Sequence, residues 1–418
     1  MHRKNLRMNN FSIDQIPHYS GNQLIYACGD ILDTASLATK LSSSPKVPDD
    51  GDMLPFHLRV HLIQSLRDLH IPSRQGIAVA ASLDLMLRQG YAYKKPGTQG
   101  FYDAFTKSSP FQAKMIASAV IGPSGVGKTL SIERPLAQYS QVVDHEKMPG
   151  FISGFKQLLW LKVDAPNSGK LVDFLSNLME ATDMALGTNY FSATLKKDKK
   201  VPADMEKEWA GVARKHMLGI LVIEEIQNLF KILPIKERLK KQQSSTKQQN
   251  TIKDDNTLKF LITATNSWKL PIMVSGTNDA MAIFQTRAST TGRFITHGYH
   301  SMVTPNGADD KDFKDVIFPT LCKYQWVKKK LPNTDEFRHL IYDLTAAIPR
   351  VYINLWIAAH SIAFENNRDE LIFDDFKNGL VKYMEPMIPA IDAMKSDDPL
   401  KLSKYEDLFP RDAEFWVV

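Results

Sequence analysis

The chain has 418 residues, 43% of them hydrophobic, and carries a formal net charge of +6. This length predicts two or three domains rather than one, and the apolar fraction suffices for ordinary globular cores. The mild positive charge favours an anionic partner without requiring one. No uncharged apolar run reaches the length of a transmembrane helix, so we expect no membrane partner.

The two cysteines, Cys28 and Cys322, lie far apart and lack the spacing of metal ligands. No signal peptide is recognisable. These features together predict a cytoplasmic protein, where a reducing environment keeps thiols unpaired. We expect both thiols to be buried or inert.

Residues 1–110 are predicted to form a mostly helical N-terminal extension that docks a partner. Apolar side chains recur at steps of three and four over 56–69, and again over 76–87, which predicts two helices. Gly90 is the predicted C-cap of the second helix. Between the start of the chain and these helices, residues 34–54 are rich in Ser, Pro and Asp and predict a connector.

Residues 111–305 alternate short apolar runs with helical patterns, including predicted helices over 169–186 and 202–215. Such alternation predicts an α/β domain whose parallel sheet is covered by helices on both faces. The predicted strands are 115–121, 157–163, 218–223, 270–275 and 297–303.

After Pro305 the pattern becomes wholly helical, and residues 306–395 are predicted to form an all-α lid subdomain. A tail over 396–418 ends in the apolar residues 415–418. Docking of this tail on a partner and folding onto the chain's own core are both open. The predicted lid helices are 311–323, 334–347, 350–365 and 373–383.

Residues 122–129 match the complete phosphate-binding loop pattern G-x-x-x-x-G-K-[ST]. The apolar run 115–121 precedes the loop and a helix-compatible segment follows it. The glycines allow backbone N–H groups to turn inward towards an anion. Lys128 would reach the β- and γ-phosphates of ATP, and the Thr129 hydroxyl would hold Mg²⁺. The predicted cofactor-binding residues here are Gly122, Pro123, Ser124, Gly125, Val126, Gly127, Lys128, Thr129 and Leu130.

Two carboxylates, Glu224 and Glu225, follow the predicted strand 218–223. In the second nucleotide signature, the first carboxylate orients the Mg²⁺ shell and the second polarises the attacking water. We therefore predict Glu224 as a metal ligand and Glu225 as a catalytic residue. The usual pair is Asp-Glu, and the longer Glu224 favours contact with Mg²⁺ through a water and leaves the hydrolysis rate open.

Three further side chains complete the predicted site. Asn278 follows the strand 270–275 and would hold the lytic water or the γ-phosphate. Arg293 precedes the last strand and would reach the ATP of a neighbouring subunit, where an arginine stabilises transition-state charge; Arg287 is the alternative. Arg350, near the start of an apolar helix, would touch the phosphates from the lid side.

The phosphate-binding loop, the paired carboxylates and the later Asn and Arg residues, in this order, resemble those of AAA+ ATPases. The resemblance implies a five-stranded parallel sheet in the order 5-1-4-3-2. It also implies Mg²⁺-dependent hydrolysis of ATP to ADP and phosphate, which we expect to be slow because of Glu224.

N-terminal and linking segments, together with the segments that carry the ATPase motifs, resemble the TnsC-type regulators of transposition, and the match spans about residues 17–300. Two positions depart from that family: Gln23 stands where a proline is usual, and Glu224 where an aspartate is usual. The similar segments are 19–32, 67–72, 90–96, 122–134 and 221–229.

TnsC-type proteins regulate cut-and-paste transposition in bacteria. The resemblance implies that the chain oligomerises on double-stranded target DNA, as a ring of six or seven subunits or as a filament. It further implies links to a target selector of the TnsD/TniQ kind and to the TnsA and TnsB transposase subunits. The family engages the transposase with its C-terminal region, so the resemblance implies transposase docking as one role for 396–418, with folding onto the chain's own core as an equal alternative. Hydrolysis would reset or limit the assembly, and the chain would cut no DNA itself.

Two basic clusters are the predicted contacts with DNA: 196–200, and part of a Gln/Ser-rich insert over 236–253. Contacts with phosphates would be independent of DNA sequence and sensitive to salt. Solvated flexible loops are an equal alternative for each cluster. The predicted DNA-binding residues are Lys196, Lys197, Lys199, Lys200, Lys236, Arg238, Lys240 and Lys241.

Two other functions stay open. An initiator-like or helicase-loading AAA+ protein would share the ATPase motifs but should carry a winged-helix DNA reader, for which 396–418 is too short. An ATP-binding scaffold with little hydrolysis is suggested by Glu224. Measured turnover, with and without DNA, separates the scaffold from the transposition regulator.

Overall fold

A computed structural model describes residues 13–48, 50–106, 113–229, 255–280 and 292–396. Several sequence predictions lie outside these residues: the DNA contacts Lys236, Arg238, Lys240 and Lys241, the alternative arginine Arg287, and the tail over 397–418.

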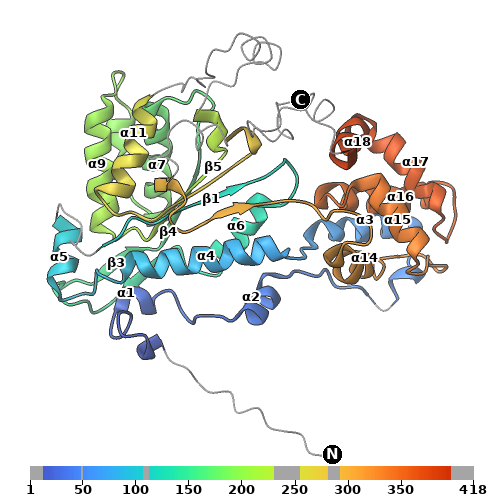
Figure 1. Ribbon diagram of the computed structural model, residues 1–418, viewed down its shortest axis with the longest axis horizontal. Helices are drawn as coiled ribbons and strands as arrows, with labels where there is room; N and C mark the ends of the chain where they lie inside the picture. Colours follow the sequence, from blue (N-terminus) through green and yellow to red (C-terminus); the bar gives the residue numbers. More distant parts are fainter. Residues whose placement is uncertain (1–12, 49, 107–112, 230–254, 281–291, 397–418) are drawn as a thin grey trace, which may run out of the picture.

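The central sheet has five parallel strands in the order β4-β5-β6-β1-β7. Read from the β7 edge, this is the predicted order 5-1-4-3-2, which is therefore confirmed. β1, β5 and β6 are buried along their whole length because helices cover both faces of the sheet (Figure 1). The strands are β1 (Ala117–Ile121), β4 (Trp160–Asp164), β5 (Ile220–Glu224), β6 (Ile272–Gly276) and β7 (Tyr299–Ser301).

A small antiparallel pair, β2 (Val142–His145) and β3 (Phe155–Leu158), adjoins the main sheet. The prediction of one strand over 157–163 is wrong in this respect, because β3 ends and β4 begins within it. Leu159 marks the change of partner: its N–H donates to the Gln141 carbonyl, and its carbonyl accepts from the N–H of Ile220 in β5. One continuous apolar run thus contributes β3 to the small sheet and β4 to the main sheet.

The first face of the main sheet is covered by α7 (Leu171–Leu186), α9 (Pro202–Lys215) and α11 (Asp255–Asn266). Alternate strand residues such as Ile121 and Ile223 pack there against Phe174, Trp209 and Phe260. This alternation follows from the two-residue period of a strand, which sends successive side chains to opposite faces.

The second face is covered by α1 (Gln23–Tyr26), α4 (Arg74–Tyr91) and α6 (Lys128–Leu136). The strand residues Val120 and Val222 pack there against Leu83 and Ile132. Asn22 fixes α1 to α4: its side-chain oxygen caps α1 at the Leu24 N–H, and its amide donates to the carbonyl of Tyr91 at 2.9 Å. Helices of the N-terminal extension therefore complete this core.

α4 continues to Tyr91, so Gly90 lies inside the helix and the prediction of a C-cap at Gly90 is wrong. A Cβ on Gly90 would stand 2.5 Å from Pro271 Cγ, at the start of β6. Glycine is needed here for the close approach of α4 to the sheet.

The predicted connector over 34–54 contains α2 (Thr34–Leu41), which Asp33 caps at the Ser36 N–H.

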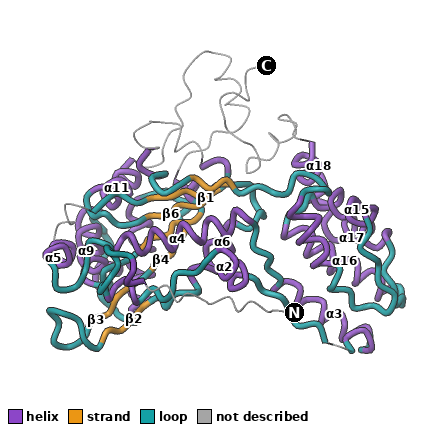
Figure 2. Tube along the Cα trace, turned by 60° about the horizontal axis from the view of Figure 1, so that its bottom comes forward, coloured by secondary structure: helices purple, strands orange, loops and turns teal. Residues whose placement is uncertain are grey.

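The C-terminal helices enclose a third core, and each predicted lid segment contains helix. α3 (Phe56–Gln64), from the N-terminal extension, lies against them beside α16 (Figure 2). Arg59 of α3 is 3% exposed and pairs with Asp369, with 2.6 Å between Nη1 and Oδ1. The C-terminal helices are a π-helix (Phe313–Ile317), α14 (Phe318–Leu321), α15 (Asp335–Thr345), α16 (Pro349–Glu365), α17 (Phe373–Met384) and α18 (Ile388–Ser396).

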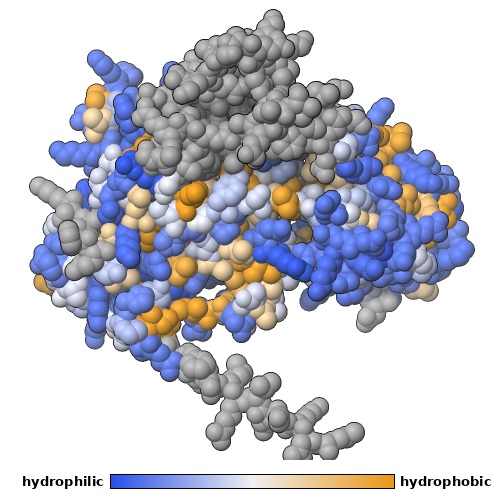
Figure 3. Space-filling view, viewed as in Figure 1, coloured by the Kyte–Doolittle hydropathy of each residue, from blue (hydrophilic) through white to orange (hydrophobic). Residues whose placement is uncertain are grey.

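The remaining short elements connect these layers. They are the 3₁₀ helices Ile13–Gln15, Gly51–Met53, Ser65–Asp68, Ile226–Leu229, Asn278–Ala280 and Glu385–Met387, and the α-helices α5 (Gln99–Thr106) and α8 (Ser192–Leu195). Within the described residues, no helix combines the length and the apolar character that crossing a membrane requires. The face shown in Figure 3 is mostly hydrophilic over the C-terminal helices, with smaller hydrophobic groups between.

Candidate nucleotide-binding site

The phosphate-binding loop joins β1 to α6 at the carboxyl edge of the sheet. Gly127 is the N-cap of α6 and has φ +96°, a left-handed conformation that side chains with a Cβ rarely adopt. No side chain caps α6 in the described structure. The N–H groups of its first turn are therefore placed to bind an anion, assisted by the positive end of the helix dipole.

Lys128 is the first residue of α6, and its ammonium lies within the loop. Nζ donates to the carbonyl oxygens of Gly122 and Pro123, each at 2.8 Å. Thr129, the next residue, is exposed at the start of the helix. Both predicted phosphate and metal contacts thus lie at the mouth of the loop.

Glu224, the last residue of β5, is 6% exposed and lies opposite Asp164 of β4. Its Oε2 is 3.3 Å from Lys162 Nζ, while its Oε1 is buried without a hydrogen bond to any described residue. Burial raises the pKa of this carboxyl, and the Lys162 charge acts in the opposite direction. An unsatisfied buried carboxylate oxygen fits the donor set that Mg²⁺ or its bound water prefers.

Lys162 also binds Glu133 of α6, so it ties β4 and β5 to the helix that follows the phosphate-binding loop. Burial by itself would lower the pKa of Lys162, but the hydrogen bond to Glu133 and the charge of Glu224 outweigh it and raise that pKa. The sequence patterns did not indicate Lys162. A charged residue inside an otherwise apolar strand was the signal that could have indicated a role for Lys162.

Glu225 is exposed and has φ +53°, an unusual conformation for a residue with a side chain. Its carboxylate accepts a hydrogen bond from Gln227 Nε2. Gln227 Oε1 in turn accepts from the Thr277 N–H at 3.2 Å. Gln227, also missed in the sequence analysis, therefore connects Glu225 to the end of β6, next to Asn278.

The remaining predicted residues lie on different elements. Asn278 begins a short 3₁₀ helix after β6, and Arg293 is half-buried just before β7. Arg350 is exposed in the first turn of α16. A Cβ on Gly125 would lie 3.3 Å from Ile348 Cγ2, so the start of α16 adjoins the phosphate-binding loop. These placements are compatible with the predicted roles, which stay predictions.

A cavity of about 450 Å³ adjoins the loop at Val126 and Gly127. Its other walls come from residues 69–77, from 303–317 and from the start of α16. Apolar side chains, among them Ile71 and Ile317, supply much of the lining, and the volume lies in the range of small-molecule sites. No sequence pattern indicated this cavity, because its walls come from segments far apart in the chain.

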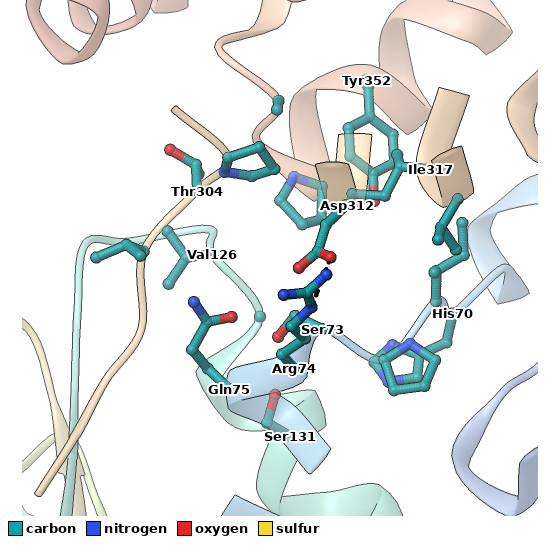
Figure 4. A pocket seen from close by; sticks show the side chains of 18 of the residues that line it. His70, Ser73, Arg74, Gln75, Val126, Ser131, Thr304, Asp312, Ile317 and Tyr352 are labelled. Atoms are coloured by element: carbon teal, nitrogen blue, oxygen red, sulfur yellow. Dashed lines mark ion pairs between the residues drawn. The ribbon is translucent and has the colours of Figure 1, made fainter. Parts of the chain in front are cut away.

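Polar side chains reach into the same cavity (Figure 4). Arg74 and Asp312 point towards one another and form an ion pair, with 2.9 Å between Nε and Oδ1. Burial, together with the nearby charge of Arg134, lowers the pKa of His70 to about 4. The His70 ring is therefore neutral at pH 7, and the lining suits a flat, neutral aromatic group with polar edges.

Residues 116–284 match the family model described as an AAA domain. This segment contains the phosphate-binding loop, both carboxylates and Asn278. Together with the strand order, the match defines the fold as that of an AAA+ P-loop ATPase with helical extensions. No curated protein matches the sequence.

Among solved structures, the chain is similar to the ORC2 protein of Aeropyrum pernix in ADPNP–ADP complexes. The TM-score is 0.42 at 11% identity, over 81% of this chain and 82% of that one. The ORC1 protein of the same organism, in complex with DNA, has a TM-score of 0.42 at 16% identity, over 79% and 70% of the two chains. The RuvB Holliday junction branch migration motor of Thermotoga maritima has 0.32 at 12%, over 72% and 67%.

Proposed function

We propose that this chain is a cytoplasmic, Mg²⁺-dependent ATPase of the AAA+ class that assembles on duplex DNA and regulates transposition. The observation that carries the ATPase part is the complete phosphate-binding loop beside the buried Glu224 and the cavity at Val126. The transposition part rests on the resemblance of segments such as 19–32 and 221–229 to TnsC-type regulators.

In this proposal the base of ATP occupies the cavity and the phosphates lie on the loop. Thr129 and Glu224 would hold Mg²⁺, which would neutralise the charge that develops on the phosphates. Lys128 turns from the loop carbonyls to the β- and γ-phosphates. The buried Glu224 Oε1 is the metal-facing atom that this geometry leaves available.

Hydrolysis then depends on residues at the ends of β5 and β6. Glu225 polarises the attacking water, and Asn278 holds that water or the γ-phosphate. Arg350 contacts the phosphates from the lid, and Arg293 reaches the ATP of the next subunit. Because Arg293 acts between subunits, ATP at the boundary favours a ring of six or seven copies or a filament.

We assign DNA binding to the two basic clusters of the sequence. Lys196, Lys197 and Lys199 are exposed beyond α8 and form no ion pair with the described residues. Lys200 is half-buried, and its Nζ lies 3.4 Å from Ser176 Oγ. The insert with Lys236, Arg238, Lys240 and Lys241 is the second proposed contact.

Partner contacts follow the proposed domains: 1–110 as a docking extension, 111–305 as the ATPase domain, 306–395 as the lid and 396–418 as the tail. A target selector of the TnsD/TniQ kind and the transposase subunits TnsA and TnsB are the proposed partners. Truncation at Pro410 tests the tail. We expect loss of transposase pull-down with ATPase activity intact, and unchanged pull-down would contradict this assignment.

The ATPase assignment is tested by turnover and nucleotide binding of Lys128→Ala and Glu225→Gln, with and without duplex DNA. We expect Lys128→Ala to lose ATP binding. Glu225→Gln should bind ATP and lose roughly 10²-fold or more in turnover, since the polarising carboxylate is gone. Lys215→Ala, an exposed lysine at the end of α9, is the control. Normal ATP binding and turnover in Lys128→Ala would refute the site. If the wild-type protein itself binds ATP but does not hydrolyse it, the chain is better described as an ATP-binding scaffold.

DNA binding is tested by a salt titration with charge-reversal variants of 196–200 and 236–241. Loss of phosphate contacts should weaken binding and reduce its dependence on salt. Lys207→Glu, on the exposed face of α9, is the matched control. Unchanged affinity in a cluster variant would remove that cluster from the DNA contact.

A further inference from the structure

A second cavity, of about 30 Å³, lies at the amino ends of the strands, opposite the edge that carries the phosphate-binding loop. Leu218 and Leu270, which precede β5 and β6, form part of its wall. The rest comes from the end of α9, from α5 and from the segment after α4. Figure 1 shows α5 and α9 at the end of the molecule away from the C-terminal helices.

Among the described residues, two cations line this cavity and no acidic side chain does. Lys94 is 6% exposed, and Arg214 is half-buried. Neither side chain forms a hydrogen bond or an ion pair within the described parts of the chain. Each cation instead lies near an aromatic ring. Lys94 Nζ is 6.0 Å from the centre of the Tyr91 ring, and the Arg214 guanidinium carbon is 6.0 Å from the centre of the Trp268 ring.

A buried positive charge without a counter-ion is costly, and proteins normally pair it or hold it for a ligand. Burial lowers the pKa of Lys94 to about 8. At pH 7 the ammonium therefore still carries most of its charge. Arg214, the other cation at the cavity, keeps its charge at any physiological pH. The cavity thus presents two positive charges to whatever enters it.

We propose that this cavity binds a carboxylate group, with one oxygen on Lys94 and the other on Arg214. A volume of about 30 Å³ accommodates roughly two water-sized atoms, which matches two carboxylate oxygens better than the four oxygens of a phosphate. Ala104, Ala210 and Ala213 offer an apolar wall for an aliphatic stem. A free carboxylic acid and an acidic side chain of a second copy of this chain both supply this chemistry.

The test is thermal unfolding of the full chain in acetate and in chloride at equal ionic strength and pH 7. We expect acetate to raise the Tm of the wild type more than chloride does. The extra rise should disappear in Lys94→Met and shrink in Arg214→Met. Lys215→Met, which neighbours Arg214 on α9 and lies outside the cavity, should keep the full rise. Fluorescence of Trp268 supplies a second readout, which Trp268→Phe should abolish.

Two results would overturn the proposal: an acetate effect no larger than that of chloride on the wild type, or an equal acetate effect on wild type and Lys94→Met. Because the phosphate-binding loop itself offers a site for inorganic phosphate, the comparison uses only the part of each anion's effect on Tm that Lys94→Met removes. That part should be smaller for phosphate than for acetate at the same ionic strength, and a larger part for phosphate would contradict the carboxylate assignment. If Lys94→Met does not fold, the acetate effect on the Tm of Arg214→Met, a change at a half-buried position, is compared with that of the wild type instead.

Protein concentration distinguishes the two sources of carboxylate. If a second copy supplies the group, the wild-type Tm in chloride rises with protein concentration, and Lys94→Met loses that dependence. If a free acid is the ligand, the Tm does not change with concentration while the acetate effect persists. Both results support the site, and both differ from a loss of the acetate effect, which refutes it.

Discussion

Single side chains decide how the proposed site handles charge. Glu224 is buried and is tied to Lys162 through one oxygen, while its other oxygen has no hydrogen-bond partner in the described parts of the chain. Glu225, the next residue, is exposed and is held by Gln227. One carboxylate therefore lies where it can hold a cation, and its neighbour lies where a water molecule can reach it. This division of environment agrees with the two different roles proposed for the pair.

Replacement of Glu224 by Gln removes the metal-facing charge and preserves the shape of the side chain. We expect the Mg²⁺ concentration for half-maximal turnover to rise roughly tenfold or more, because a charged oxygen ligand is lost. A Mg²⁺ titration of ATP turnover measures this shift. Asp164→Asn, at the exposed position opposite Glu224 in β4, removes an equal charge from the same edge and should change it far less. Equal shifts in the two variants would contradict the ligand role.

Lys94 predicts a dependence of stability on pH. Its pKa is about 8 in the folded chain and near 10.4 when unfolded, so between these values the unfolded chain binds more protons. The free energy of unfolding should therefore rise with pH from about 8 to about 10.4, by up to about 3 kcal/mol. Lys94→Met should lack this rise, as the difference between the two denaturation curves at each pH will show. A parallel pH dependence in the two proteins would contradict a buried, unpaired lysine.

At the scale of elements, the apolar runs predicted the buried strands of the main sheet. They did not predict where one run is divided between two sheets. β1, β5 and β6 are buried on both faces, so their apolar runs are continuous. At Leu159 the same apolar signal continues while the backbone changes partners, which no local pattern encodes. The helix α2 was missed because Ser and Pro around it indicated a connector. Its cap, Asp33, was the signal that could have indicated a helix.

Gly90 tests the close packing of α4 on the sheet. Gly90→Ala places a Cβ 2.5 Å from Pro271 Cγ, and we expect a loss of about 1–3 kcal/mol in the free energy of unfolding from overpacking. Gly211→Ala in α9 is the matched control, because a Cβ there meets no atom of the described residues within 4 Å. That variant should gain about 0.5–1 kcal/mol, the helix preference of alanine over glycine. Chemical denaturation of both variants measures the contrast, and a stabilised Gly90→Ala would refute the explanation.

At the scale of the whole molecule, the N-terminal extension belongs to two cores. α4 packs on the sheet, whereas α3 packs on the C-terminal helices. The segment between them, 69–77, forms one wall of the cavity beside the phosphate-binding loop. Local sequence patterns predicted most of these helices but not where they dock, since docking depends on contacts between residues hundreds of positions apart. This arrangement places the cavity where movement of the C-terminal helices against the sheet would alter it.

Arg59 provides the test of that arrangement. It is buried, pairs with Asp369 and donates to the Trp326 carbonyl at 3.2 Å, so it joins α3 to the C-terminal helices. Arg59→Ala should destabilise the chain by about 3–5 kcal/mol, since a buried pair and its hydrogen bonds are broken. Arg67→Ala, an exposed neighbour that bonds Asn354, should cost less than about 1 kcal/mol. Similar denaturation midpoints for the two variants would contradict a shared core.

The most direct test of the proposed function is the mass of particles formed on duplex DNA with Mg²⁺ and a non-hydrolysable ATP analogue. For the wild type, the proposal predicts assemblies of several copies on DNA with the analogue and their loss with ADP. Lys128→Ala should stay unassembled in either nucleotide. A wild-type protein that remains monomeric, or assembles without regard to nucleotide and DNA, would contradict the claim that ATP at a subunit boundary drives assembly around the duplex.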